Sequence, residues 1–259
     1  MINIRSKREI EIIRECGFIV CETLDMLAEK IKPGITTKEL DEMAADFIYS
    51  RGGRPAFYGF HGYPANICVS IDSEVVHGIP GKKRLEEGQI VSIDIGVKKD
   101  GYFGDSARTF AVGDISFEKR RLIEITKQAL NAGIERAVEG SRLLDISNSI
   151  QNFVESNRFS VVRELVGHGI GSELHEEPRI PNFGPANRGP LLKSGMVFAI
   201  EPMVNAGSHE VFTASDGWTV KTSDGSASAH FEHTVVITAN GPLVLTENEI
   251  EFPIEEMIG

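Results

Sequence analysis

The chain has 259 residues, of which 41% are hydrophobic and 25% are charged, and its formal net charge is −11 at pH 7. This composition is typical of a globular protein that can bury a sizeable core, and no apolar run approaches the roughly 18 residues of a membrane span. The acidic balance argues against indiscriminate nucleic-acid binding, which needs a basic surface.

The N-terminal segment has no uninterrupted apolar stretch of the signal-peptide type. Three cysteines are present, Cys16, Cys21 and Cys68, and none of them forms a Cys-x-x-Cys pair. Neither a disulfide framework nor a zinc ribbon is therefore indicated. We expect a cytoplasmic, monomeric protein whose thiols are reduced and packed.

Two capping boxes predict the first two helices. The box at residues 6–9 begins a long amphipathic helix, which ends before the Lys-Pro-Gly sequence at 32–34. The box at 36–39 begins a shorter helix, which ends at the Arg-Gly-Gly sequence at 51–53. Strands are then predicted near 66–71 and 75–78.

A β-hairpin is predicted over residues 90–110, because apolar strand patterns flank the turn residues Asp100 and Gly101. Its two arms carry Asp94 and Asp105. A four-residue loop would place the two aspartates directly opposite each other, and a two-residue loop would make them diagonal neighbours on the same face. An odd-length loop would separate them. Carboxylates that lie so close repel each other, so either one holds a proton or a cation lies between them.

The helical pattern recurs after Gly113. A long helix is predicted over about 116–138, a shorter helix over about 144–157 and a strand over 159–165. A shift of 106 residues aligns Gly34 with Gly140, Leu40 with Ile146, Ala44 with Ile150, Phe47 with Phe153 and Ile48 with Val154. We expect an α+β fold in one domain, 1–259, with half-repeats of about 1–113 and 114–259 that are related by a pseudo-twofold axis and enclose a site between them.

The C-terminal half is rich in loops and strands. Strands are predicted over 196–201, 218–221 and 229–238. Glu201 and Glu232 lie in two of these apolar strands, where an ionised side chain needs a partner.

Three histidines are further candidates for a site. His168 lies between glycines that allow a close backbone approach, His175 lies in a loop-rich segment, and His77 lies in the strand predicted near 75–78. Each of these residues has an ordinary alternative as a structural or surface group. Two aspartates, two glutamates and one imidazole together would suit two adjacent divalent cations bridged by carboxylates, such as manganese, cobalt or iron, rather than a thiolate zinc site.

Several short motifs occur in a fixed order along the chain. They are Val-His-Gly-Ile-Pro at 76–80, Asp-Ile-Gly at 94–96, Gly-Asp-Ser at 104–106, Gly-His-Gly-Ile-Gly at 167–171, His-Glu-Glu-Pro at 175–178, Glu-Pro at 201–202 and Glu-His-Thr at 232–234. In this order they resemble the motifs of the type I methionine aminopeptidases, over nearly the whole chain and in the short bacterial form. The resemblance implies the pita-bread fold, in which helices flank a curved, mostly antiparallel sheet.

The resemblance also implies a dimetal site. Asp94, Asp105 and Glu232 would hold one ion, and Asp105, His168, Glu201 and Glu232 would hold the other, so that Asp105 and Glu232 bridge both. The two divalent ions in such a site would be cobalt, manganese, iron or zinc.

Removal of the initiator methionine from nascent proteins with a small second residue is the implied reaction, by attack of a metal-bridging water or hydroxide. Glu201 would accept a proton from that water. His175 would donate to the scissile carbonyl oxygen, and His77 would stabilise the tetrahedral species and the departing nitrogen.

An apolar pocket for the methionine side chain is implied as well. The residues that match it are Phe57, Phe60, Tyr63, Cys68, Leu174 and Trp218. Their alternative is an ordinary core role. Nascent polypeptides would be the partners, which is compatible with a transient ribosome contact.

Two other functions stay open from the sequence. An Xaa-Pro aminopeptidase or dipeptidase of the same fold would use a similar ligand set, but such enzymes usually carry an additional N-terminal domain. A non-catalytic peptide-binding module would typically lack some ligands, whereas here the set is complete.

Overall fold

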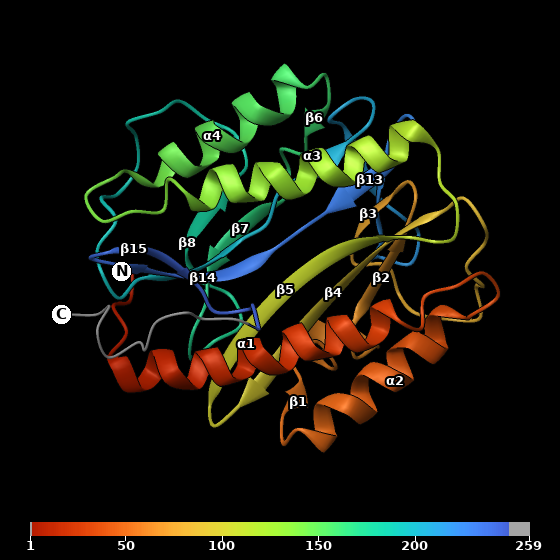
Figure 1. Cartoon of the computed structure of the whole chain (residues 1–259), viewed down its shortest axis with the longest axis horizontal. Helices are drawn as coiled ribbons and strands as arrows, with labels where there is room; N and C mark the ends of the chain where they lie inside the picture. Colours follow the sequence, from red (N-terminus) through yellow and green to blue (C-terminus); the bar gives the residue numbers. More distant parts are fainter. Residues whose placement is uncertain (1, 249–259) are drawn as a thin grey trace.

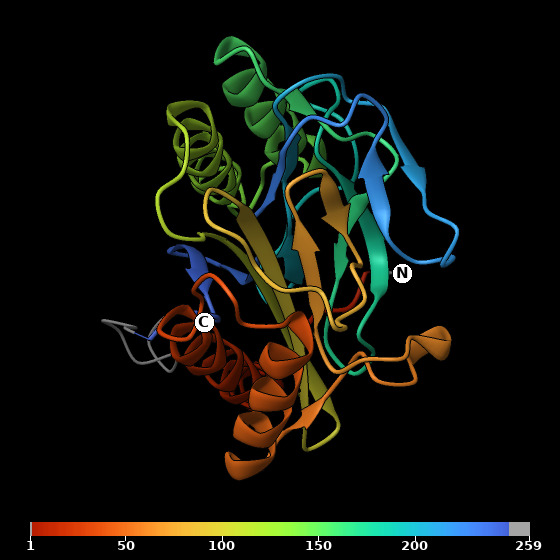
Figure 2. The ribbon, with the colours of Figure 1, turned by 90° about the vertical axis from the view of Figure 1, so that its right-hand side faces the viewer.

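The structure is a computed structural model that describes residues 2–248. Two helix pairs lie on opposite sides of the strands in Figure 1, and Figure 2 shows most strands to one side of both pairs. The pairs are α1 (Lys7–Ala28) with α2 (Thr37–Ser50), and α3 (Phe117–Ile134) with α4 (Leu143–Ser156).

Both predicted capping boxes are confirmed. The Ser6 side chain accepts from the Glu9 N–H, and the Glu9 carboxylate accepts from the Ser6 N–H. Thr36 and Glu39 make the same reciprocal pair at the start of α2. These bonds satisfy backbone donors that a helix start otherwise leaves unpaired.

All the paired strands within residues 2–248 are antiparallel. One sheet has the order β1-β4-β2 with β5 on β4, a second has the order β15-β14-β9-β7-β8, and two smaller sheets have the orders β13-β10-β6 and β11-β12-β3. The strands are β1 (Arg54–Pro55), β2 (Cys68–Ile71), β3 (Glu74–Val76), β4 (Ile90–Lys99), β5 (Tyr102–Ala111), β6 (Ser160–Val161), β7 (Val166–Gly169), β8 (Glu176–Pro181), β9 (Val197–Ile200), β10 (Met203–Asn205), β11 (Val211–Thr213), β12 (Val220–Thr222), β13 (Ser228–His230), β14 (His233–Thr238) and β15 (Gly241–Val244), with a 3-10 turn at Phe60–Gly62.

The two helix pairs correspond closely. Helices α2 and α4 each have 14 residues, and their first residues, Thr37 and Leu143, are 106 positions apart. Gly34 and Gly140, in the loops before them, both have a positive φ, of 94° and 85°. Each of these glycines donates its N–H to a leucine carbonyl. We therefore propose one domain built of two half-repeats, about 1–113 and 114–259.

Separate apolar clusters fill the two halves. One cluster joins α1 and α2 to β2 and β4, and is built entirely from residues before 113. Another joins α3 and α4 to β9 and β14, and it draws almost all of its residues from the second half. A third cluster takes residues from both halves, among them Phe57 and Leu174, and lies against the site described below.

Two strand predictions are wrong in extent. The segment predicted as one strand over 159–165 pairs only at Ser160–Val161, before the chain turns into β7. The strand predicted over 229–238 is split into β13 and β14, because each part joins a different sheet.

The three cysteines are free and buried, as expected. No helix within residues 2–248 is long and apolar enough to cross a membrane.

Candidate active site

The hairpin of β4 and β5 places two carboxylates on one face. Lys99 pairs with Tyr102, so the turn consists of Asp100 and Gly101, whose φ values of 47° and 86° suit a type I′ turn. The two-residue loop is therefore the correct alternative. Asp94 lies opposite Ala107 and Asp105 lies opposite Gly96, which makes the aspartates diagonal neighbours.

Glu201 and Glu232 lie where two paired strands pass from one sheet to another. Ile200 pairs with His233 at the end of one ladder, and Met203 pairs with His230 at the start of the next. The residues between, including both glutamates, are outside the named strands. The break frees these side chains from the alternation of a continuous strand, so both can face the aspartates.

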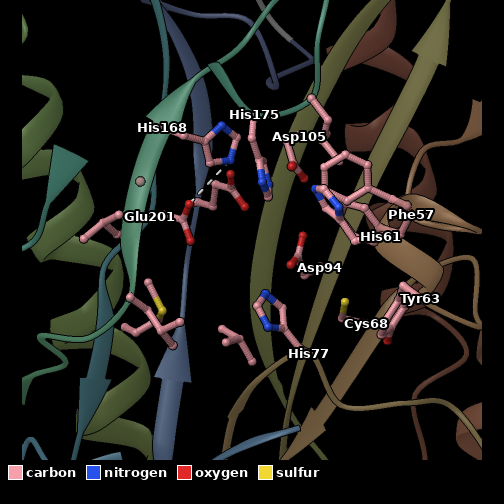
Figure 3. A pocket seen from close by; sticks show the side chains of 18 of the residues that line it. Phe57, His61, Tyr63, Cys68, His77, Asp94, Asp105, His168, His175 and Glu201 are labelled. Atoms are coloured by element: carbon pink, nitrogen blue, oxygen red, sulfur yellow. Dashed lines mark ion pairs between the residues drawn. The ribbon is translucent and has the colours of Figure 1, made fainter. Parts of the chain in front are cut away.

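The predicted metal ligands converge. Figure 3 shows four of them, Asp94, Asp105, His168 and Glu201, at the same pocket. Ligand atoms of Asp94, Asp105 and Glu232 lie within 4.8 Å of one another, and so do those of His168, Glu201 and Glu232. A third group with the same spacing contains Asp105, His168 and His175. Asp105, His168 and Glu232 each belong to two groups, and of these three only Asp105 and Glu232 are carboxylates with two oxygen atoms to offer.

Unpartnered oxygen atoms show that this donor set fits cations. Asp94 Oδ1, Asp105 Oδ1 and Glu232 Oε1 are buried without a hydrogen-bond partner among the described residues. Burial raises the pKa of Asp105 to about 7. Burial, and then repulsion from Asp105, also raise the pKa of Asp94 and of Glu232 well above the usual range. Divalent cations would relieve both the burial and the repulsion.

His168 is held as a neutral imidazole with one nitrogen free. Its Nδ1 lies 2.9 Å from the Gly169 carbonyl oxygen, to which it donates, so Nε2 is left unprotonated. Nε2 lies 3.6 Å from Glu201 Oε1. Burial, and then the neighbouring His175, lower the pKa of His168 to about 3. A neutral ring fixed by such a bond is the usual form of a metal-ligating histidine.

His175 and His77 line the same cavity (Figure 3). The His175 ring centroid lies 4.2 Å from that of His168 and 5.1 Å from that of Phe60. Burial, and then the charges of His77 and His61, lower the pKa of His175 to about 4. His77 follows β3 with a φ of 59°, and burial lowers its pKa.

All six predicted pocket residues belong to one apolar cluster beside the carboxylates. Phe57, Phe60, Tyr63, Cys68, Leu174 and Trp218 line a cavity of about 600 Å³ together with the five candidate ligands. The Tyr63 hydroxyl donates to the Gly78 carbonyl at 2.9 Å, and the Tyr63 and Trp218 rings meet edge to face at 5.1 Å. The cavity therefore has one apolar wall and one acidic wall.

Three side chains near the site were missed in the sequence. His61 lines the cavity beside Phe60. His230 is 1% exposed, and its Nε2 lies 3.7 Å from Glu201 Oε2. Arg5 forms a buried ion pair with Glu176, the residue after His175. The position of His230, two residues before Glu232, was the available signal; nothing local to Arg5 indicated its distant partner.

The model of metallopeptidase family M24 matches residues 11–239. A methionine aminopeptidase from Clostridium perfringens is 54% identical over 95% of this chain and 99% of the relative. The crystal structure of a methionine aminopeptidase from Thermotoga maritima superimposes with a TM-score of 0.95 and 43% identity, covering 96% of this chain and all of that one.

A prolidase from Pyrococcus furiosus shares the fold less closely. Its TM-score is 0.78 and its identity is 27%, and this chain covers 66% of its length. The pita-bread fold expected from the motifs is confirmed, and the similarity to methionine aminopeptidases is much greater than that to the prolidase. The chain belongs to metallopeptidase family M24.

Proposed function

We propose that this chain is a metal-dependent aminopeptidase that removes the N-terminal methionine from proteins and peptides with a small second residue. The observation that carries the proposal is the convergence of Asp94, Asp105, His168, Glu201 and Glu232 at one wall of an apolar cavity. The high identity to methionine aminopeptidases over almost the whole chain supports the same substrate.

Two divalent ions per chain would be held by these five residues. Asp94 would serve one ion and His168 and Glu201 the other, while Asp105 and Glu232 would serve both. Glu232 is shared by the group of Asp94 and the group of His168 and Glu201, and Asp105 lies near His168 in a third group, which supports this division. Such ions lower the pKa of water to near neutrality and polarise carbonyl groups. Oxygen-rich donors with one imidazole suit cobalt, manganese, iron or zinc.

Glu201 would accept and pass on a proton. Burial raises its pKa well above the usual range, with repulsion from Asp105 as the second cause, and a raised pKa favours a carboxylate that accepts a proton. His175 would donate to the carbonyl oxygen as it becomes anionic, and His77 would support the tetrahedral species and the departing nitrogen. Both histidines line the cavity.

The apolar wall would hold the methionine side chain. An unbranched thioether packs favourably against aromatic rings such as Tyr63 and Trp218. A substrate whose side chain occupies this wall brings its α-amine close to the carboxylates that line the same cavity. Because only the first residue of a chain has a free α-amine, this arrangement favours an aminopeptidase.

The decisive experiment compares Met-Ala-Ser peptides with Xaa-Pro peptides, after chelation and re-addition of single metals. We expect methionine release that is lost on chelation and restored by a divalent ion. Preferential cleavage of Xaa-Pro bonds, or turnover that survives complete metal removal, would refute the proposal. Action in the cytoplasm as a monomer, with a transient ribosome contact, stays a prediction from the sequence.

A further inference from the structure

His230 is a buried histidine whose ring is held without a close polar partner. It ends β13, and its backbone is fixed because its N–H donates to Thr109 Oγ1 and its carbonyl accepts from the same hydroxyl, both at 2.8 Å. It also pairs with Met203 across the ladder. Neither ring nitrogen has a hydrogen-bond partner among the described residues. A buried polar ring with both nitrogens unpaired needs a physical explanation.

The two oxygens of Glu201 face two different imidazoles. Oε1 lies 3.6 Å from His168 Nε2, and Oε2 lies 3.7 Å from His230 Nε2. His168 donates through Nδ1 to a backbone carbonyl, which leaves its Nε2 for a cation. The side of Glu201 that faces His230 is therefore the side turned away from the ligating histidine.

We propose that His230 is a positioning residue, whose Nε2–H donates to Glu201 Oε2 and fixes the carboxylate for proton transfer. This inference rests on the role of Glu201 given above. The separation of 3.7 Å is longer than a hydrogen bond, and such catalytic contacts commonly shorten when the site is loaded. Partners of this kind that orient a ligand are typically worth about 10–100-fold in activity or metal affinity.

The tautomer follows from the surroundings. A proton on Nδ1 would leave that N–H buried without an acceptor, while Nε2 would turn an unprotonated lone pair toward a carboxylate. A proton on Nε2 removes both penalties and leaves only one acceptor unpaired. The ordinary alternative is that the buried His230 ring has only a packing role.

Matched variants separate the two roles. His230→Met replaces the ring with an apolar side chain of similar size that has no hydrogen-bond donor. His230→Gln retains an N–H donor that can reach the position of Nε2. His209→Met is the control, because His209 also has a buried, unpartnered Nδ1 and is not among the residues that line the cavity.

We expect His230→Met to lower kcat for Met-Ala-Ser by about 10–100-fold with KM nearly unchanged, and His230→Gln to restore most of the loss. His209→Met should leave kcat at the wild-type value. Equal losses in the Met and Gln variants, or an equal loss in His209→Met, would show a packing role and overturn the proposal. So would a wild-type kcat in His230→Met.

NMR of the wild-type protein with ¹⁵N-labelled histidine tests the tautomer of His230 independently of activity. The protein is titrated with Zn²⁺, which is diamagnetic, in the absence of Mn²⁺. The Nε2–H tautomer of His230 is expected in both the metal-free and the loaded forms, and an Nδ1–H tautomer would overturn the proposal. If the wild-type enzyme fails to release methionine while His230 shows the Nε2–H tautomer, the proposed substrate is wrong and the contact with Glu201 stands.

Discussion

Replacement of Arg5 by alanine tests how the N-terminal segment supports the loop that carries His175. Arg5 precedes α1, and its guanidinium binds both carboxylate oxygens of Glu176, with each side chain 8% exposed. The backbone N–H of Arg5 also donates to the Gly195 carbonyl at 2.8 Å. A Cβ on Gly171 would overlap the guanidinium, so the loop closes tightly over it.

The loss of stability in Arg5→Ala depends on the hydrogen-bond donors that Glu176 retains. Removing one partner of a buried ion pair costs about 3–5 kcal/mol. Glu176 would still accept from Asn3 Nδ2 at 2.7 Å, from Ser172 Oγ at 3.2 Å and from the Glu173 N–H at 3.0 Å. These donors place the cost at the lower end, about 3 kcal/mol, which corresponds to a Tm lowered by about 6–12 °C in a protein of this size.

Thermal unfolding with Arg51→Ala as the control measures this cost. The Arg51–Glu22 ion pair, at 3.1 Å, is 47% exposed on the arginine side, so its loss should cost at most about 1 kcal/mol. The double variant Arg5→Ala/Glu176→Gln should be less destabilised than the sum of its two single variants, because no unpaired charge remains. A Tm for Arg5→Ala as high as that of the control would refute the reasoning.

Two further predictions concern charge. Asp105→Ala removes a carboxylate that belongs to two ligand groups. It should abolish turnover and the Mn²⁺ binding measured by calorimetry, while the circular dichroism spectrum stays near that of the wild type. Asp114→Ala, at a side chain 99% exposed, is the control, and wild-type turnover in Asp105→Ala would contradict the ligand assignment. Burial opposes ionisation of Glu9, but hydrogen bonds from Ser6 and Tyr102 outweigh it and lower its pKa from 4.5 to about 2. The stabilisation of the fold by ionised Glu9 is therefore present above pH 4.5 and is lost as the pH falls toward 2. Glu9→Gln should flatten the dependence of Tm on pH in this range. An unchanged slope of Tm against pH would contradict the prediction.

Local signals predicted the helices, because a capping box and helical spacing are determined by neighbouring residues. Ser6 and Thr36 begin helices where their boxes indicated. The hairpin could be narrowed to alternatives but not resolved, since its register depends on whether Asp100 adopts a positive φ.

Long-range features could not be read in the same way. The strand that contains Glu232 looks continuous, and only the pairing of His230 and His233 with different sheets breaks it. The ion pair of Arg5 and Glu176 joins residues 171 positions apart. The candidate ligands could be predicted because their residue types and the motifs around them indicated metal chemistry, whereas their spacing along the chain did not. Their roles stay predictions.

The division of the candidate ligands between the two proposed half-repeats has a consequence during synthesis. Asp94 and Asp105 are on the β4–β5 hairpin, whereas Glu201 and Glu232 flank the later strands. Asp105 is then held by Thr234, whose hydroxyl accepts from the Asp105 N–H at 3.0 Å and donates to its carbonyl at 2.8 Å. A growing chain therefore has an incomplete set of ligands until its last strands have left the ribosome, so the enzyme would become active only near the end of its own translation.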